Sequence, residues 1–138
     1  MQDFRKLSVW SKSHELVLLI YAATGNVSEK KFPGLISQIR RAAASIPANI
    51  AEGCGHTHSR ELARFLGIGL ASAFELTYHL QLAADLGVIS KSDYARLDAR
   101  TDVLTRMLSS LLSKVRHRAA EPPKRPQSPK HIRQPSDS

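Results

Sequence analysis

The fold is decided by Ile39-Arg-Arg-Ala-Ala-Ala-Ser-Ile-Pro-Ala-Asn-Ile-Ala-Glu-Gly53, a stretch that places a proline inside a helical pattern. Ala43, Ile46 and Ile50 keep the three- and four-residue spacing of one apolar helix face. The spacing continues unbroken past Pro47. An interior proline removes one backbone hydrogen bond and costs roughly 3 kcal/mol in a free helix. We therefore expect a kinked helix that tertiary packing holds together across this proline.

Three further segments carry helical periodicity, and the chain shows no alternating strand pattern. Ser59 and Ser90 can each cap the first amides of a helix, and Gly25 and Gly87 stand where a left-handed residue commonly ends one. Pro33 suits the first turn of the second helix. The sequence predicts an all-α fold of four helices, over about residues 8–24, 33–52 and 59–86 and from Ser90 with an apolar stripe that reaches Val115.

The link between the second and third predicted helices is short, so these helices should form an antiparallel hairpin. The numbers of residues that face each other should then sum to about 112. In this register small residues meet small residues, and acids meet bases, because an unpaired charge inside a bundle is costly. The predicted pairings are Ala43 and Ser45 with Gly69 and Gly67, Glu75 with Arg40 or Arg41, and Glu52 with Arg60 and Arg64.

Polar residues form a line beside the apolar face of this hairpin. Buried polar groups are usually paired, so we interpret the line as a network that fixes the helix register, with a ligand pocket as the alternative. The residues of this predicted network are Arg40, Arg41, Ser45, Asn49, Glu52, Ser72 and Glu75.

The first predicted helix is apolar over more than one face. Leu18 and Tyr21 belong to the face that we assign to the core. A second apolar face is more than a monomeric four-helix bundle needs, and it suggests a subunit contact. The predicted oligomer interface consists of Leu16, Leu19 and Ile20.

The chain divides into one domain and a tail. Its 138 residues suffice for one core, and we expect a four-helix domain over residues 1–118. Residues 119–138 hold five of the seven prolines and little apolar surface, so we expect a disordered, basic tail. The single Cys54, the lack of a signal-peptide pattern and the lack of a long apolar run predict a cytoplasmic protein without a membrane partner.

The net charge of +8 is concentrated near the C-terminus, where residues 114–138 hold seven Lys and Arg against two acids. Such clusters bind phosphates by releasing counterions; the alternative is a solvated helix end that complements the helix dipole. No aromatic residue is interleaved with these cations, so base stacking is not indicated. The candidate nucleic-acid-binding residues are Arg116, Arg118, Lys124, Arg125, Lys130 and Arg133, followed by Lys114, Arg96 and Arg100.

No arrangement of reactive residues in the sequence points to an enzyme. Cys54, His56 and His58 could ligate a transition metal, but a structural zinc site needs four ligands and no second cluster supplies the rest. Glu75 and His79 stand four residues apart, whereas di-iron bundles use a three-residue spacing. We therefore predict no catalytic residue, no metal and no cofactor.

Four stretches resemble the four-helix bundle family of the 23S rRNA intervening sequence proteins, namely residues 41–53, 65–68, 75–76 and 82–87. The Ser-Ile-Pro-Ala-Asn-Ile-Ala-Glu-Gly string within the first stretch is the most specific of them. The resemblance spans about residues 4–116, and it departs from the family pattern at Ala71-Ser72, where Gly-Ser is favoured.

The resemblance implies an antiparallel up-and-down four-helix bundle that assembles as a ring-like homopentamer, in bacteria, with no established enzymatic activity. The family is similar in fold to the accessory variability protein of diversity-generating retroelements, a basic pentamer that binds nucleic acid and a reverse transcriptase. By this analogy we expect an oligomeric, nucleic-acid-associated protein, and we prefer RNA over DNA because of the resemblance. The alternative is a protein-interaction scaffold, for example an accessory subunit of a reverse transcriptase, which docks its partner on the first helix.

Overall fold

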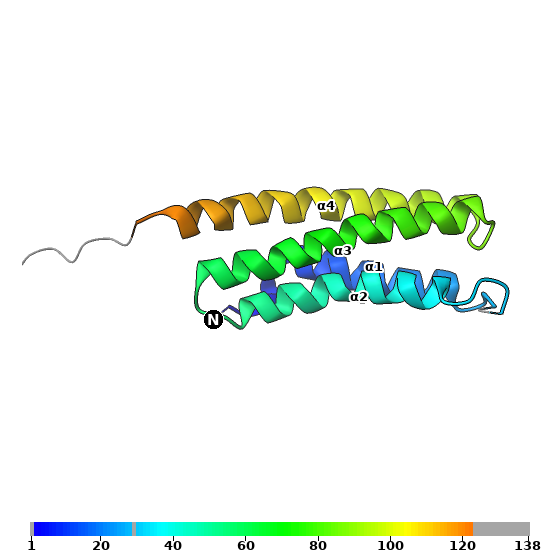
Figure 1. Ribbon diagram of the computed structural model, residues 1–138, viewed down its shortest axis with the longest axis horizontal. Helices are drawn as coiled ribbons and strands as arrows, with labels where there is room; N and C mark the ends of the chain where they lie inside the picture. The colour runs from blue at the N-terminus through cyan, green and yellow to red at the C-terminus, as the bar shows by residue number, and fades with distance from the viewer. Residues whose placement is uncertain (1, 29, 123–138) are drawn as a thin grey trace, which may run out of the picture.

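The computed structural model describes residues 2–28 and 30–122 of the chain (Figure 1). A short 3-10 helix, η1 (Phe4–Lys6), precedes the helices α1 (Ser8–Thr24), α2 (Leu35–Cys54), α3 (Ser59–Asp85) and α4 (Lys91–Ala120). Within these two ranges there is no strand, and the predicted all-α fold is confirmed. Nor does any helix in them contain an apolar stretch long enough to cross a membrane.

The four long helices run alternately up and down and pack as neighbours in chain order (Figure 1). α2 and α3 make the most extensive contact, α3 packs against α4, and α1 closes the bundle against both α2 and α4. The contact between α1 and α4 is the least extensive of the four. The bundle is therefore antiparallel, each helix packs against two others, and α1 and α4 pack against each other least extensively.

α2 continues through Pro47 without a break. Ile39, Ile46 and Ile50 are completely buried, and Pro47 itself lies in the core. Burying one such aliphatic side chain contributes about 1.5–3 kcal/mol, so three of them offset the roughly 3 kcal/mol that an interior proline costs. The prediction of a helix that runs through Pro47 and is packed in the core there is confirmed, and the kink stays a prediction.

The backbones of α2 and α3 approach closely where glycines lie at the contact. A Cβ atom at Gly69 would lie 3.7 Å from the carbonyl oxygen of Ile46. A Cβ atom at Gly53 would lie only 3.0 Å from Cδ1 of Leu62. A Cβ atom at Gly53 would therefore crowd α3, whereas one at Gly69 would make ordinary contact with α2 and only larger side chains would collide with it.

The register of this hairpin differs from the predicted one by about one helical turn. The pairs in contact have numbers that sum to 115–118, as in Gly53 with Leu62, Arg41 with Glu75, and Asn49 with Gly69. The predicted pairing of Ala43 and Ser45 with Gly69 and Gly67 is therefore wrong, whereas the predicted pairing of Glu75 with Arg41 is confirmed. Gly53, the next-to-last residue of α2, faces Leu62 of α3. The first turn of α3 therefore lies beyond the end of α2, and this offset shifts the register.

Two predicted helix boundaries are confirmed in detail. The Oγ of Ser90 accepts a hydrogen bond at 3.0 Å from the backbone N–H of Asp93, as an N-cap residue should. Gly87 ends α3 in the left-handed region with φ of 71°. The backbone N–H of Val88 then donates to the carbonyl of Ala83 at 2.8 Å, which closes the helix end.

Other boundaries differ from the prediction. Gly25 follows α1 with a right-handed φ of −62°, and Ser59 is the first residue inside α3 rather than its cap. Pro33 lies outside α2, because Gly34 precedes that helix with φ of 82°. α4 continues to Ala120, past the predicted domain boundary at residue 118, since alanine is a strong helix former. The predicted tail lies outside the described residues from 123 onward.

The apolar faces of α1 differ from the predicted ones, because Trp10 and Val17 pack against the core as predicted but Leu18 and Tyr21 do not. Leu16 and Ile20 are 1% and 0% exposed in the core, and Leu19 is half-buried. Leu18 and Tyr21, which were assigned to the core, are 57% and 48% exposed. Leu16 and Ile20 cannot reach another subunit, so placing these two residues in the predicted interface was wrong. Leu19 lines a surface hollow, and its place in an interface stays a prediction.

Two buried hydroxyl residues make the core face of α1 difficult to recognise from the sequence. Ser13 and Thr24 are buried on the same stripe as Leu16 and Ile20. Each hydroxyl donates to a carbonyl of its own helix at 2.7 Å, Ser13 to Trp10 and Thr24 to Ile20. A hydroxyl satisfied in this way can be buried at little cost. The core stripe therefore does not read as apolar along its whole length.

Candidate nucleic-acid interface

Three parts of the chain meet at one end of the bundle, namely the N-terminal residues, the α2–α3 turn and the last turns of α4 (Figure 1). The backbone N–H of Gln2 donates to the carbonyl of Cys54 at 3.0 Å, which ties the start of the chain to the end of α2. Beside this contact lies a polar pocket of about 350 Å³ whose walls include His56, His58 and Arg118. Segments that are distant in sequence therefore share one surface.

This end carries exposed cations from η1, from the first turn of α3 and from the last turns of α4. We call them the basic end: Lys6, Arg60, Lys114, Arg116 and Arg118. No acidic side chain of the described residues forms an ion pair with any of the five. Arg64, by contrast, is paired with Glu61 at 3.4 Å. The cations of the basic end therefore remain available to an anion.

The structure brings together part of the predicted nucleic-acid-binding set. Lys114, Arg116 and Arg118 belong to the basic end, and Arg116 also lies beside α3, with Nη2 3.9 Å from the Cβ position of Gly67. The other four residues of the C-terminal set, Lys124, Arg125, Lys130 and Arg133, lie outside the described residues.

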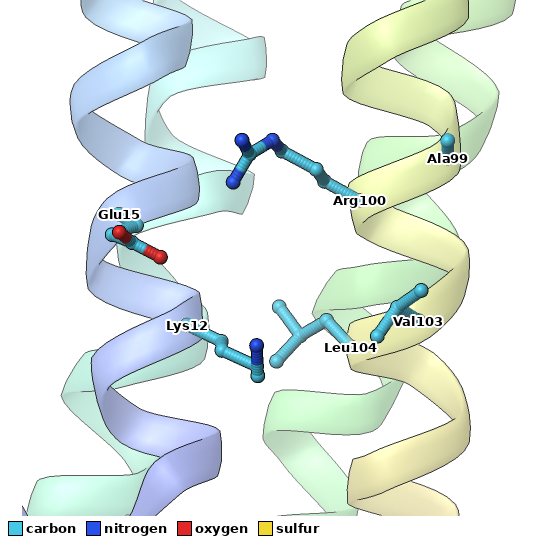
Figure 2. A pocket seen from close by; sticks show the side chains of 6 residues that line it. All are labelled: Lys12, Glu15, Ala99, Arg100, Val103 and Leu104. Carbon is cyan, nitrogen blue, oxygen red and sulfur yellow. The ribbon is translucent and has the colours of Figure 1, made fainter.

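Arg96 and Arg100 lie elsewhere on α4. Arg96 is paired with Asp93 at 3.3 Å. Figure 2 shows Arg100 reaching from α4 toward α1, where Glu15 and Lys12 stand opposite it. Because a helix rises about 1.5 Å per residue, Arg100 is roughly 20 Å along α4 from the cations of the basic end. These two arginines are not part of that surface.

Lys6 and Arg60 were not among the candidates from the sequence. Arg60 was expected to pair with Glu52, but Glu52 is exposed and forms no ion pair with Arg60 or Arg64 within the described residues. The predicted topology of the bundle could have identified Lys6 and Arg60 as candidates. In an up-and-down bundle the start of the first helix, the second turn and the end of the fourth helix all lie at the same end.

The predicted polar network separates into two clusters that both join α2 to α3. In the first, the Oγ atoms of Ser45 and Ser72 are 2.8 Å apart, and Asn49 Nδ2 donates to Ser45 Oγ at 3.0 Å. In the second, Arg41 Nη2 donates to Glu75 Oε1 at 2.9 Å. These polar atoms satisfy one another, as a network that fixes register requires.

Arg40 and Glu52 do not take part in either cluster. Arg40 Nε donates to Thr24 Oγ1 of α1 at 3.0 Å, and its guanidinium lies 4.5 Å from the centre of the Tyr21 ring. Successive helix residues point about 100° apart, so Arg40 faces α1 while Arg41 faces α3. Glu52 is exposed. Placing these two residues in the α2–α3 network was therefore wrong.

We expect Glu75→Ala to lower the free energy of unfolding by only about 1 kcal/mol. The Arg41 and Glu75 side chains are 66% and 38% exposed, so solvent screens their attraction. The substitution also removes the carboxylate that lies 3.2 Å from His79 Nε2. Urea unfolding followed by circular dichroism measures the change. Glu75→Gln keeps an oxygen for His79 and should cost less, and a loss above about 3 kcal/mol for alanine would contradict the surface character of the pair.

One histidine of the α2–α3 turn makes an aromatic contact. His56 stacks on Phe65 with ring centroids 5.2 Å apart. Cys54 is 2% exposed, and burial, with a smaller contribution from Asp3, raises the pKa of its thiol. In the part of the chain that the structure describes, no three His, Cys, Asp or Glu side chains are grouped to hold a metal ion.

Known proteins with this sequence pattern and fold support the resemblance. The model of the family described as 23S rRNA-intervening sequence protein matches residues 5–110. The crystal structure of a protein with unknown function from the S23 ribosomal protein family of Bacteroides thetaiotaomicron is similar, with 28% sequence identity and a TM-score of 0.68, over 75% of this chain and 97% of that chain. None of the curated proteins matches the sequence. The chain therefore belongs to the family of the 23S rRNA-intervening sequence proteins.

Proposed function

We propose that this protein is a non-enzymatic, oligomeric RNA-binding protein whose basic end contacts phosphates. The observation that carries the proposal is the convergence of five exposed cations, from three separate segments, on one end of the bundle. None of the five is neutralised by an ion pair with an acid of the described residues. Such a surface attracts a polyanion because binding releases the counterions of the nucleic acid.

The position of Arg60 supports a functional role because it does not favour folding. Arg60 is the second residue of α3 and lies near the positive end of the helix dipole, where a cation is unfavourable. Arg118 lies in the last turn of α4, near the negative end of that helix dipole, where a cation is favourable. Helix stability therefore accounts for Arg118 but not for Arg60. Binding to a phosphate would explain the positions of both residues.

We propose RNA as the ligand because of the proteins that this chain resembles. Its family is named for an intervening sequence of 23S rRNA, and the similar Bacteroides protein is placed in an S23 ribosomal protein family. Contacts from Lys and Arg to phosphate position a nucleic acid without reading its bases. We therefore expect binding to RNA with little sequence preference.

We also propose that the protein assembles with copies of itself. Large apolar side chains are between 48% and 63% exposed on α1, α3 and α4, namely Leu18, Tyr21, Phe74, Tyr78 and Val103. Exposed apolar patches on soluble proteins commonly mark interfaces. An oligomer would present several basic ends to one RNA strand, and linked contacts of this kind bind more tightly than single ones.

The salt dependence of RNA binding tests the proposal. The full-length protein is titrated into a fluorescent oligouridylate, and the logarithm of the association constant should fall linearly with that of the salt concentration, by about 0.7 for each phosphate contacted. Exchanging Lys124, Arg125, Lys130 and Arg133 for glutamine should make the slope shallower without abolishing binding. A slope near zero, or no binding at about 50 mM salt, would contradict a phosphate interface.

A further inference from the structure

A polar pocket lies at the basic end of the bundle, where the N-terminal residues, the α2–α3 turn and the last turns of α4 meet (Figure 1). Its volume is about 350 Å³, and sites for small ligands commonly measure about 300–1,000 Å³. Gln2 forms part of one wall and is held by the hydrogen bond from its backbone N–H to the carbonyl of Cys54, at 3.0 Å. The pocket is therefore formed by the tertiary structure of the bundle and not by one loop alone.

The polar side chains around this pocket can all donate hydrogen bonds. They comprise one amide, two hydroxyls, two imidazoles and one guanidinium, and no acid lines the pocket in the described part of the chain. A concave surface with several donors and no carboxylate suits an anion with several oxygen atoms, because hydrogen bonds to a charged group are the stronger ones. The six residues are Gln2, His56, Thr57, His58, Ser59 and Arg118.

The two acids that are sequence neighbours of pocket-lining residues have cationic partners outside the pocket. Asp3 lies 3.9 Å from the guanidinium of Arg5, and Glu61 is paired with Arg64 at 3.4 Å. Arg118, by contrast, forms no ion pair with an acid of the described residues. The positive charge that faces this pocket is therefore available to a ligand.

The structure holds several of these donors in place before any ligand binds. His56 stacks on Phe65, whose side chain is only 7% exposed, with the two ring planes 16° apart. Beside it, α3 begins without a side-chain cap, and the backbone N–H of Leu62 is the first that reaches a carbonyl, that of His58 at 3.1 Å. The amides before it, beginning with that of Ser59, add donors next to the side chains of the pocket.

We infer that this pocket binds the terminal phosphate of an RNA strand. A terminal phosphate monoester carries a charge of about −1.5 to −2 and offers three oxygen acceptors, whereas an internal phosphodiester carries a single charge and leaves only two oxygens free. Walls from three segments surround the pocket, so the end of a strand can enter it more easily than an internal phosphate with nucleotides on both sides. The inference rests on the RNA binding proposed above and names the group that this part of the surface recognises.

The pocket and the rest of the basic end share Arg118. Lys114 lies one helical turn before Arg118 on the same face of α4, so it can contact a phosphate that follows the terminal one. Arg116 lies on the side of α4 that meets α3, with Nη2 3.9 Å from the Cβ position of Gly67. The pocket would thus hold the end of the strand, and the remaining cations would hold the phosphates behind it.

Competition binding tests the inference with three unlabelled oligouridylates that displace a fluorescent one from the full-length protein. One strand carries a 5′-phosphate and one a 3′-phosphate. The third has hydroxyls at both ends and is two nucleotides longer, so that its total charge matches the others. We expect one phosphorylated strand to compete about tenfold better than the charge-matched strand, and the preferred strand shows which terminus enters the pocket.

A double variant, His56→Gln with His58→Gln, tests whether the preference arises in this pocket. Both histidines are exposed, so the variant should fold, which circular dichroism checks. It should lose the tenfold preference but bind the charge-matched strand almost as the wild type does, because neither histidine belongs to the basic end. The control is His14→Gln with His117→Gln, which also removes two exposed histidines, one of them stacked on an aromatic ring, and should keep the preference.

The possible results separate this inference from the proposed function. Strong, salt-dependent binding with no preference for either phosphorylated strand would overturn the pocket's role and leave the phosphate interface standing. Equal loss of the preference in both double variants would overturn its assignment to this pocket. Displacement by inorganic phosphate at the concentration at which the strands compete would assign the pocket to a free anion and overturn the RNA terminus as its ligand. Failure of every strand to bind would overturn both proposals.

Discussion

Exchanging Lys114, Arg116 and Arg118 together for glutamine should weaken binding to a single-stranded oligouridylate about 100-fold at about 0.1 M salt. Each phosphate contact on a single strand contributes about 0.7 to the slope of log K against log salt, so losing three contacts lowers the slope by about 2. Fluorescence anisotropy across a series of salt concentrations measures both quantities. The melting temperature should change little, because these residues are exposed and unpaired with the acids of the described residues.

A matched variant removes the same charge from elsewhere on the bundle. Arg41, Arg96 and Arg106 are exposed and paired with Glu75, Asp93 and Asp102, respectively. Exchanging these three arginines for glutamine should reduce the affinity by much less, since each is already neutralised by an acid, which the five cations of the basic end are not. If the two triple variants lose affinity equally, binding follows net charge alone and the basic end has no special role.

The second large effect is on stability, because we expect Gly69→Leu to lower the free energy of unfolding. A Cβ atom at this position would lie 3.7 Å from the Ile46 carbonyl oxygen and 3.8 Å from Asn49 Cβ, so the atoms beyond it would enter α2. Overpacking of this kind typically costs 1–3 kcal/mol, and we expect about 3 kcal/mol here because backbone cannot move aside as a side chain can. Urea unfolding at one protein concentration for all variants measures the loss.

Gly69→Ala is the control for this substitution. Its added Cβ makes only ordinary van der Waals contacts with α2. Alanine is favoured over glycine inside a helix by about 1 kcal/mol, so this variant should be at least as stable as the wild type. If leucine were tolerated as well as alanine, the close approach of α2 and α3 at Gly69 would be wrong.

Much of the fold could be predicted because local signals and tertiary packing agree. The apolar spacing around Pro47 predicts a helix, and three buried isoleucines hold it there. Ser90 and Gly87 mark helix ends by chemistry that does not depend on the rest of the molecule. The register of α2 against α3 could not be predicted to better than one turn, because it depends on how far α3 extends past the end of α2.

The faces of α1 could not be predicted for a different reason. Ser13 and Thr24 satisfy their hydroxyls within the helix and therefore enter the core, which a search for apolar residues does not anticipate. The candidate site was predictable only in part. The density of positive charge in the sequence is enough to identify Lys114, Arg116 and Arg118. Arg60 lies near them only because the bundle topology brings the start of α3 to the same end. Arg100 extends from α4 toward α1, which the charge pattern does not reveal.

The most direct test of the central claim, that RNA is held at the basic end, is photo-crosslinking of the full-length protein to an oligoribonucleotide that contains 4-thiouridine. Crosslinked peptides are identified by mass spectrometry. We predict crosslinks within residues 54–64 and 110–122, which hold the α2–α3 turn and the last turns of α4. Crosslinks concentrated at the opposite end of the bundle, in the links over residues 25–34 and 86–90, or spread evenly over all four helices, would contradict it.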